Sequence, residues 1–355
     1  METRKIQMVG GGTYTVSLPK EWAESEDITA GDSVNLHTHI DGTLVLQARE
    51  CEDDATRQIA VEVAHADAEP LERTLRAAYA VGAKEVRLDA ADGFTTGQRR
   101  VIDLVARNLP GVSVTEESES KITVRTLLDT EEVSVRQSVR QLKFVALSMH
   151  RDATDVVTGD TPPGNLADRD DQADRLYAMI DRSFAQGLAR LDVVDALELT
   201  RSELFELWGT TRELERVADH AEGIATVATE IDNSIGEPTT DELREISQRA
   251  REIITDAVSV IIGDADVETA QQALTARDQL REDITTFECR LAESSNVGAQ
   301  LRPILDRLRR TAEHGGNIAE FGLRHGIRHG KRIEPSQETT DRHDPTQESH
   351  VSTGG

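Results

Sequence analysis

Three carboxylates at helical spacing are the first residues in this sequence that could do chemistry. Glu215, Asp219 and Glu222 occupy positions i, i+4 and i+7 of a segment whose apolar residues recur every three to four positions. Like charges at that spacing repel one another by a few tenths of a kcal/mol in an isolated helix, and a cation bound between them would remove the repulsion. The pattern therefore indicates a candidate metal site along one edge of a helix.

A second acidic strip precedes the first one in the chain. Asp170, Asp174 and Asp181 fall on one side of another predicted helix, next to its apolar face. Carboxylates on facing helices commonly build metal sites in helical bundles, and their oxygen atoms suit Mg, Ca, Mn or iron. We expect the two strips to face each other, with Glu215 and Asp219 opposite the first.

The segment that carries Glu215 recurs 94 residues later. The sequence LERVADHAEGIATVA at 214–228 is echoed by LRRTAEHGGNIAEFG at 308–322, and His220 is matched by His314. The repeat predicts two related helical units. We expect the two histidines to pack rather than to bind a ligand.

The overall charge offers a simpler explanation for the acidic strips. The chain has 66 acidic and 40 basic residues, a net charge of −26, and only six lysines. In so acidic a chain, chance alone places about a dozen acidic pairs at i,i+4. This composition suits a protein kept soluble in high salt, and it disfavours non-specific attraction to nucleic acid or anionic lipid. The strips are therefore either metal sites or the solvated faces of a salt-adapted bundle.

Long amphipathic segments must position these acids. From residue 130 onward the periodicity predicts six helices, at 131–158, 165–192, 196–231, 240–263, 267–293 and 298–327. Asp195 with Glu198, and Thr239 with Glu242, predict capping boxes at two of the helix starts. The short loops favour two antiparallel three-helix bundles, at 130–235 and 239–328. The polar tail, residues 331–355, is expected to be disordered.

An α/β unit is predicted ahead of the helices, at residues 55–128. Strand patterns at 59–63, 85–88, 112–115 and 122–126 alternate with helix patterns at 68–80 and 96–108. The order βαβαββ favours one open sheet with helices packed on it. No glycine-rich nucleotide-binding motif occurs here, so a nucleotide site is not expected.

The first 50 residues predict a small β unit and resemble a known family. A glycine turn at 10–12, the sequence YTVSLPK at 14–20, ITAGD at 28–32 and a hairpin turn at Asp41-Gly42 follow one another. This order resembles the AbrB/SpoVT/MazE swapped-hairpin domain, whose members form intertwined dimers and in many cases bind DNA. The resemblance implies a homodimer joined through this unit.

The same resemblance gives candidate DNA contacts, although the local charge argues against a large footprint. By position, the candidates are Arg4, Lys5 and Lys20, with Thr13 and Tyr14 as polar contacts at the loop tip. Residues 21–50 add a single arginine against seven acids. A DNA-binding surface normally neutralises several phosphates with clustered lysine and arginine. A dimerisation unit without DNA binding is therefore the alternative.

The helical part also resembles a family. The sequence LERVADH at 214–220, together with the acidic segment RDDQADRL at 169–176, is similar to the PhoU family, including archaeal phosphate uptake regulators. The resemblance implies two three-helix bundles that bind divalent or multinuclear metal ions, such as iron, Zn, Mg or Mn, and that modulate phosphate uptake. The implied ligands of the first bundle are Asp170, Asp174, Glu215 and Asp219. Those of the second are Asp278, Glu282 and Glu313, with Arg309 in place of a fourth acid.

Together these patterns favour a phosphate-responsive transcription regulator. Its N-terminal unit would bind DNA, and its bundles would sense a metal or a signalling partner. The alternative is an adaptor that does not bind DNA and that negatively modulates a phosphate ABC transporter or its signalling partner. A di-metal carboxylate enzyme is a third reading, but no Glu-x-x-His pair falls on a predicted helix, so we do not expect an enzyme.

The remaining signals concern location. The first residues lack the apolar core of a secretory signal, and no run of 18 apolar residues occurs. Cys51 and Cys289 are single and far apart, so neither a disulfide framework nor a CxxC metal site is expected. We expect a cytoplasmic protein without a membrane insertion.

Overall fold

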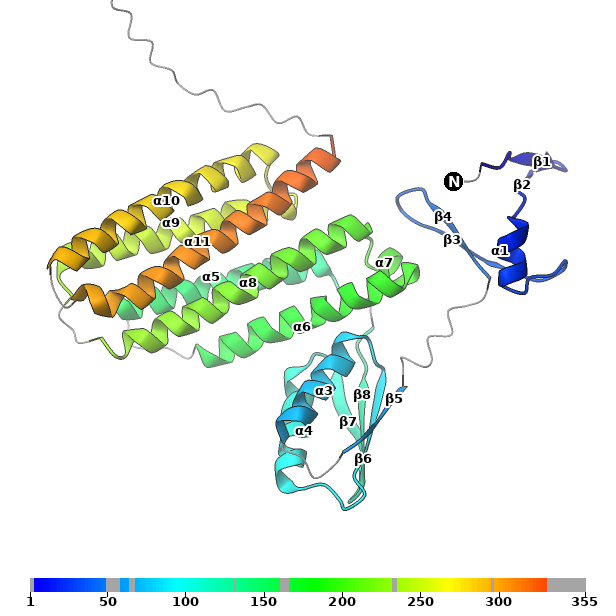
Figure 1. Ribbon diagram of the computed structural model, residues 1–355, viewed down its shortest axis with the longest axis horizontal. Helices are drawn as coiled ribbons and strands as arrows, with labels where there is room; N and C mark the ends of the chain where they lie inside the picture. Colours follow the sequence, from blue (N-terminus) through cyan, green and yellow to red (C-terminus); the bar gives the residue numbers. More distant parts are fainter. Residues whose placement is uncertain are drawn as a thin grey trace, which may run out of the picture.

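The structure is a computed structural model with three parts along the chain (Figure 1). They are a small N-terminal β unit, a four-stranded α/β unit and a long helical region, so the predicted mixed α+β fold class is confirmed. The described residues are 3–48, 58–63, 68–129, 132–159, 166–231, 235–294 and 297–330. Cys51 and the predicted disordered tail, 331–355, lie outside them.

Two short hairpins and one helix make the N-terminal unit. Strand β1 (Gln7–Val9) pairs with β2 (Thr13–Thr15), α1 (Lys20–Ser25) follows Pro19, and β3 (Asn35–Thr38) pairs with β4 (Leu44–Gln47). The two hairpin turns use glycine at positive φ, at Gly10 and Gly42. The predicted small β unit is therefore present, with four short strands. The two hairpins form separate two-stranded sheets, each too small to bury a core of its own.

The α/β unit follows the predicted βαβαββ order. Its elements are β5 (Gln58–Glu62), α3 (Ala68–Ala80), β6 (Glu85–Asp89), α4 (Thr96–Asn108), β7 (Val112–Glu117) and β8 (Lys121–Thr126). The strand order is β5-β6-β8-β7, with β5 parallel to β6 and the other pairs antiparallel. Leu88, Ile102 and Ile122 are fully buried between the sheet and the helices. This unit therefore has its own core.

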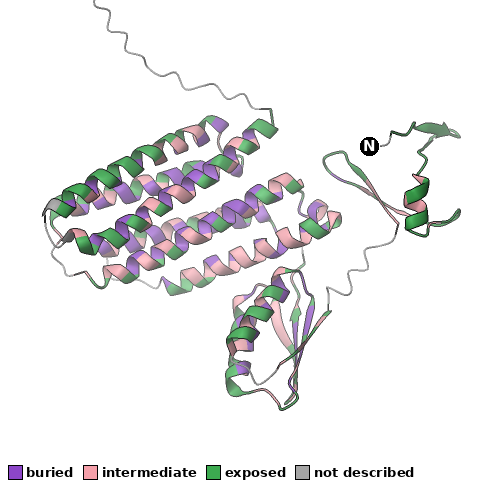
Figure 2. Cartoon of the chain, in the orientation of Figure 1, coloured by how far each residue is buried: buried purple, intermediate pink, exposed green. Residues whose placement is uncertain are grey.

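The helical region forms two three-helix groups around one continuous core. The first contains α5 (Val135–Val157), α6 (Ala167–Ala189), the short α7 (Leu191–Ala196) and α8 (Arg201–Ala228). The second contains α9 (Glu237–Ile261), α10 (Val267–Ser294) and α11 (Val297–Arg328). Helices α8 and α11 pack side by side, as do α5 and α9, and these contacts join the two groups. Figure 2 shows buried residues on the facing sides of the helices.

Two details of the predicted helix starts are wrong. The segment predicted as one helix at 196–231 contains a break, because Glu198 adopts a positive φ of 53° and separates α7 from α8. The capping box of α8 is therefore formed by Thr200 and Glu203, not by Asp195 and Glu198. Helix α9 begins after Gly236, so Thr239 lies inside the helix and does not cap it.

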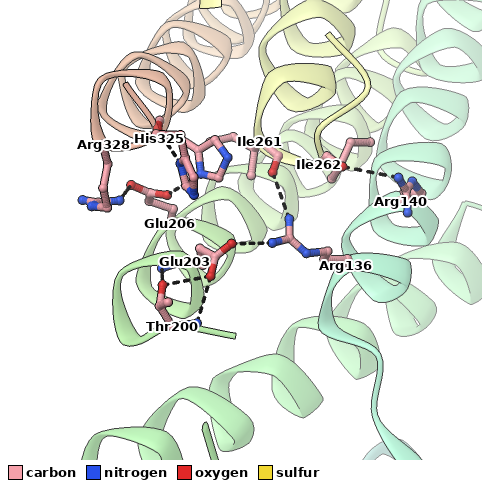
Figure 3. Close-up of polar contacts among 10 residues, drawn as sticks. Arg136, Arg140, Thr200, Glu203, Glu206, Ile261, Ile262, His325 and Arg328 are labelled. Carbon is pink, nitrogen blue, oxygen red and sulfur yellow. Dashed lines mark hydrogen bonds and ion pairs between the residues drawn. The ribbon is translucent and has the colours of Figure 1, made fainter. Parts of the chain in front are cut away.

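Ion pairs connect α5, α8 and α11 at one end of the helical region (Figure 3). Glu206, which is 1% exposed, pairs with Arg328, and its Oε2 atom lies 3.0 Å from Nδ1 of His325. Glu203 accepts a hydrogen bond of 2.7 Å from Arg136. A buried carboxylate is stable only when it is paired, so these contacts tie the end of α11 to the start of α8.

None of the helices in the described part of the chain combines the length and the apolar character that crossing a membrane requires.

Candidate metal centre and N-terminal surface

The structure brings together the four acids predicted for the first metal site. Asp170 and Asp174 lie one turn apart on α6, and Glu215 and Asp219 lie one turn apart on α8. Burial raises the pKa of Glu215 to about 7, and the charges of Asp219, Asp174 and Asp170 raise it further. The four carboxylates therefore act on one another electrostatically across the two helices.

The pKa of Asp170 is raised by the same two causes, burial and neighbouring negative charges. Burial raises the pKa of Asp170 to about 6, and Asp174, Glu222 and Asp219 add to the shift. The pKa values of Asp174 and Asp219 are raised as well, again mainly by burial. Glu222, which is part of the helical pattern of α8, thus belongs to the cluster. A cation at this place would lower all of these pKa values and relieve the repulsion.

One oxygen of the cluster has no partner. Oδ1 of Asp170 is buried and accepts no hydrogen bond from the described residues. A buried carboxylate oxygen without a donor is costly, and a cation or an ordered water would satisfy it. Oxygen donors alone fit hard cations such as Mg, Ca or Mn better than they fit Zn.

The acidic side chains of the cluster do not converge as the direct ligands of a metal ion would. Within the described ranges, no group of three or more His, Cys, Asp or Glu side chains converges closely enough to hold a metal ion. Asp181, the third acid of the α6 strip, accepts a hydrogen bond of 2.8 Å from Nε1 of Trp208 instead of facing the cluster. The described side chains therefore do not form a set of direct metal ligands, and the metal site stays a prediction.

The second bundle places arginines beside its predicted acids. Asp278 pairs with Arg277 at 2.8 Å, and Glu313 lies 3.7 Å from Arg281. Arg309, which replaces the fourth acid, pairs with Glu288 at 2.6 Å. Two of the predicted second-site residues, Asp278 and Glu282, are exposed. Guanidinium groups thus already supply positive charge to Asp278 and Glu313, which weakens the case for a metal there.

The two bundles also meet through a polar contact that the sequence did not predict. Nε2 of His220 lies 3.1 Å from Nε2 of His314, and Nδ1 of His314 lies 2.7 Å from Oε2 of Glu213. Asn317 donates a hydrogen bond of 2.9 Å to the same oxygen. The repeat identified both histidines as matching positions. Nothing in the sequence indicated that the two positions contact each other or share Glu213.

The N-terminal candidates all lie on an exposed surface. Thr13 and Tyr14 are in β2, Lys20 begins α1, and Arg4 and Lys5 precede β1. Tyr14 is 72% exposed, and Lys20 pairs with Glu24 at 3.4 Å. These side chains are therefore accessible to a partner, and the charge of Lys20 is already balanced by Glu24.

A model of the MazE bacterial antitoxin, an antidote-toxin recognition family, matches residues 7–50, and a PhoU domain model matches residues 139–228. The region matched by the PhoU model covers most of α5 and all of α6, α7 and α8, and so includes all four acids of the candidate metal centre.

The crystal structure of PhoU from Pseudomonas aeruginosa is 19% identical over 56% of this chain and 98% of that chain, with a TM-score of 0.44. A likeness at this level adds no argument of its own. No curated protein matches the chain. The predicted resemblance to PhoU and to MazE-type domains is confirmed by the family models.

Proposed function

We propose that this protein is a phosphate-responsive transcription regulator, in which a dimeric N-terminal unit binds DNA and the helical bundles receive the signal. The observation that carries the proposal is the presence of a MazE-type match at 7–50 and a PhoU domain at 139–228 in one chain. The first supplies a candidate DNA-binding module. The second supplies a candidate sensor of phosphate status.

Exposed apolar residues support a dimer of the N-terminal unit. Of the sixteen large apolar side chains exposed in the described residues, nine lie within residues 6–44. Monomeric proteins rarely leave so dense an apolar surface in water, and two separate two-stranded sheets need a partner to form a core. A second copy of the same unit meets both needs through one symmetric contact.

The acidic cluster supports a signal input at the first bundle. A cation that binds between α6 and α8 favours the arrangement in which the carboxylates lie close together. A signalling partner with basic side chains would act on the same surface. Either one changes the populations of the bundle arrangements and thereby the presentation of the N-terminal dimer.

The second candidate function is an adaptor that modulates a phosphate transporter or its signalling partner without binding DNA. The observation in its favour is the low positive charge of the N-terminal unit. Residues 21–48 carry six acids and no lysine or arginine, and Lys20 is paired with Glu24. Six basic groups per dimer give a small footprint for DNA.

A mobility-shift assay over a series of KCl concentrations separates the two functions, because phosphate contacts weaken as the salt concentration rises. The probes are promoter fragments of phosphate-uptake genes from the source genome. We expect a specific shift with the parent protein that is lost when Arg4, Lys5 and Lys20 are replaced by Ala. The matched control replaces three exposed basic residues of the α/β unit, Arg100, Arg107 and Lys121, and should keep the shift. Absence of a specific shift for the parent, or equal loss in both variants, would support the adaptor instead.

A further inference from the structure

A cavity lies where the α/β unit meets the first bundle. Its volume is about 320 Å³. It is lined by Lys84 just before β6, by the end of β8 and the segment that follows it, by the last turns of α6 and by α7. Small-molecule sites often lie at such junctions and have volumes of about 300–1,000 Å³. The cavity is therefore large enough to hold a small-molecule ligand.

The cavity is positively charged in a strongly acidic protein. Its lining contains Lys84, Arg182 and Arg190 against Asp129 and Asp192, whereas the whole chain carries −26. Arg190 is held by Asp192, with 3.1 Å between Nε and Oδ1. Lys84 and Arg182 remain against Asp129, so the lining carries a formal charge of +1 (three basic minus two acidic residues).

Arg182 is a buried guanidinium without a carboxylate. It is 4% exposed, and it donates hydrogen bonds of 2.6 Å to the carbonyl of Tyr79 and 3.1 Å to the carbonyl of Gly82. The guanidinium also lies over the Tyr79 ring. No described carboxylate forms an ion pair with it, and burial lowers its pKa.

The end of α3 compensates this charge only in part. The carbonyls at a helix C-terminus carry about half a negative charge. Two of the five N–H groups of Arg182 are used there, so three remain for other acceptors. Burying a charge that is only partly compensated costs free energy. An anion in the adjoining cavity would remove that cost.

Neighbouring side chains complete the surroundings of such an anion. Lys84 is exposed at the opening, and no described acid forms an ion pair with its ammonium group. Gln186 lies against Gly82, whose φ of +96° and close approach leave no room for a Cβ atom. Leu127 and Val193 offer apolar contacts to an organic body.

We propose that this cavity binds a small phosphate-bearing molecule, with its phosphate held by Arg182 and Lys84. An arginine fork combined with a lysine is a common way to hold phosphate oxygens. The volume leaves space for a compact body such as a sugar or a nucleoside. The site is separate from the acidic cluster, and the proposal does not depend on DNA binding.

The position of the site connects it with the N-terminal unit. Helix α7 lines the cavity through Asp192 and Val193, and its Asp195 pairs with His39, which is 5% exposed. A ligand in the cavity therefore touches the helix that contacts the N-terminal unit.

Isothermal titration calorimetry with the full chain tests the proposal. The probes are inorganic phosphate, ribose 5-phosphate and adenosine monophosphate, with ribose and adenosine as phosphate-free controls. We expect at least one phosphate probe to bind and the phosphate-free controls not to bind. The phosphate probe that binds identifies the source of the phosphate group. Absence of binding by all three phosphate probes up to about 10 mM, or equal binding of a control, would overturn the proposal.

A pair of lysine variants locates the binding. Lys84→Gln removes an exposed charge without touching the buried contacts of Arg182, and should weaken binding about tenfold. The control Lys121→Gln, at the opposite end of the paired inner strands β6 and β8, should bind as the parent does. Binding that is unchanged in Lys84→Gln places the ligand elsewhere and overturns the assignment. Thermal unfolding of each variant without ligand verifies that it is folded.

Discussion

The imidazole of His150 is held neutral by its surroundings. It is fully buried on α5, and its Nδ1 accepts a long hydrogen bond of 3.4 Å from Arg251 of α9. Burial lowers the pKa of His150 to about 3, and the charges of Arg251 and His220 add to the shift. Nε2 therefore carries the hydrogen, and it has no acceptor among the described residues.

Because His150 lies between α5 and α9, we expect the contact between these helices to become less stable in acid. The folded-state pKa lies below the unfolded value of about 6.5, so the unfolded chain binds the proton first. The contribution of His150 to the free energy of unfolding should then fall by up to about 1.4 kcal/mol per pH unit as the pH drops below 6.5. Denaturant titrations of His150→Leu between about pH 4 and 7 should give a flatter profile than the parent. The exposed control His329→Leu should keep the parental profile, and identical profiles for all three would contradict the account.

The four clustered acids predict that a metal ion binds to the first bundle and not to the predicted site of the second bundle. After dialysis against Mg or Mn, elemental analysis should find less metal in Asp174→Asn/Asp219→Asn than in the parent, because two donors and their charges are lost. The control Asp278→Asn/Glu282→Gln alters two acids of the second bundle, one of which is already paired with arginine, and should keep the parental content. Equal metal in the parent and in the first variant would exclude this cluster as the site.

At the scale of the element, the start of α8 depends on a cap that the sequence analysis placed elsewhere. The Thr200 hydroxyl accepts a hydrogen bond from the Glu203 backbone N–H at 3.2 Å, and Oε2 of Glu203 accepts one from the Thr200 N–H at 2.9 Å. Helix α8 packs against α5, α6 and α11, so its first turn matters to both bundles.

Threonine substitutions test this assignment. Thr200→Ala should lower the free energy of unfolding by about 1 kcal/mol, the usual cost of losing such a cap. Thr239→Ala removes the threonine of the mispredicted capping box and should have an effect near zero, because Thr239 lies inside α9. Urea unfolding at one fixed KCl concentration measures both. Equal effects of the two substitutions would contradict the assigned helix starts.

At the scale of the whole molecule, the N-terminal unit predicts a dimer. Leu36 and Leu44 are each 60% exposed and lie on one face of the β3–β4 hairpin. Sedimentation equilibrium should find a dimer for the parent and a monomer for Leu36→Asp/Leu44→Asp, because charges on this face oppose apolar burial. Ile327→Asp, which alters an exposed apolar residue of α11, should remain dimeric. A monomeric parent, or a dimeric double variant, would show that the exposed face serves another contact.

The sequence by itself determined most elements and their order. Helices α3 and α4 have the predicted bounds, 68–80 and 96–108, because the apolar periodicity ends at the local breakers Gly82 and Pro110. The break between α7 and α8 was missed because the apolar residues on either side continue one helical pattern. Helical periodicity does not reveal the positive φ of Glu198, which depends on how the two helices pack.

Only the tertiary structure decided which charges meet. The acids of α6 and α8 were expected to face each other because their spacing and the repeat placed both strips beside a core stripe. The arginine partners of Asp278 and Glu313, the contact between His220 and His314, and the cavity around Arg182 join residues from separate elements. Local spacing fixes the face of a helix on which a side chain lies. The side chain that it meets depends on how the helices pack, and that depends on burial summed over the whole core.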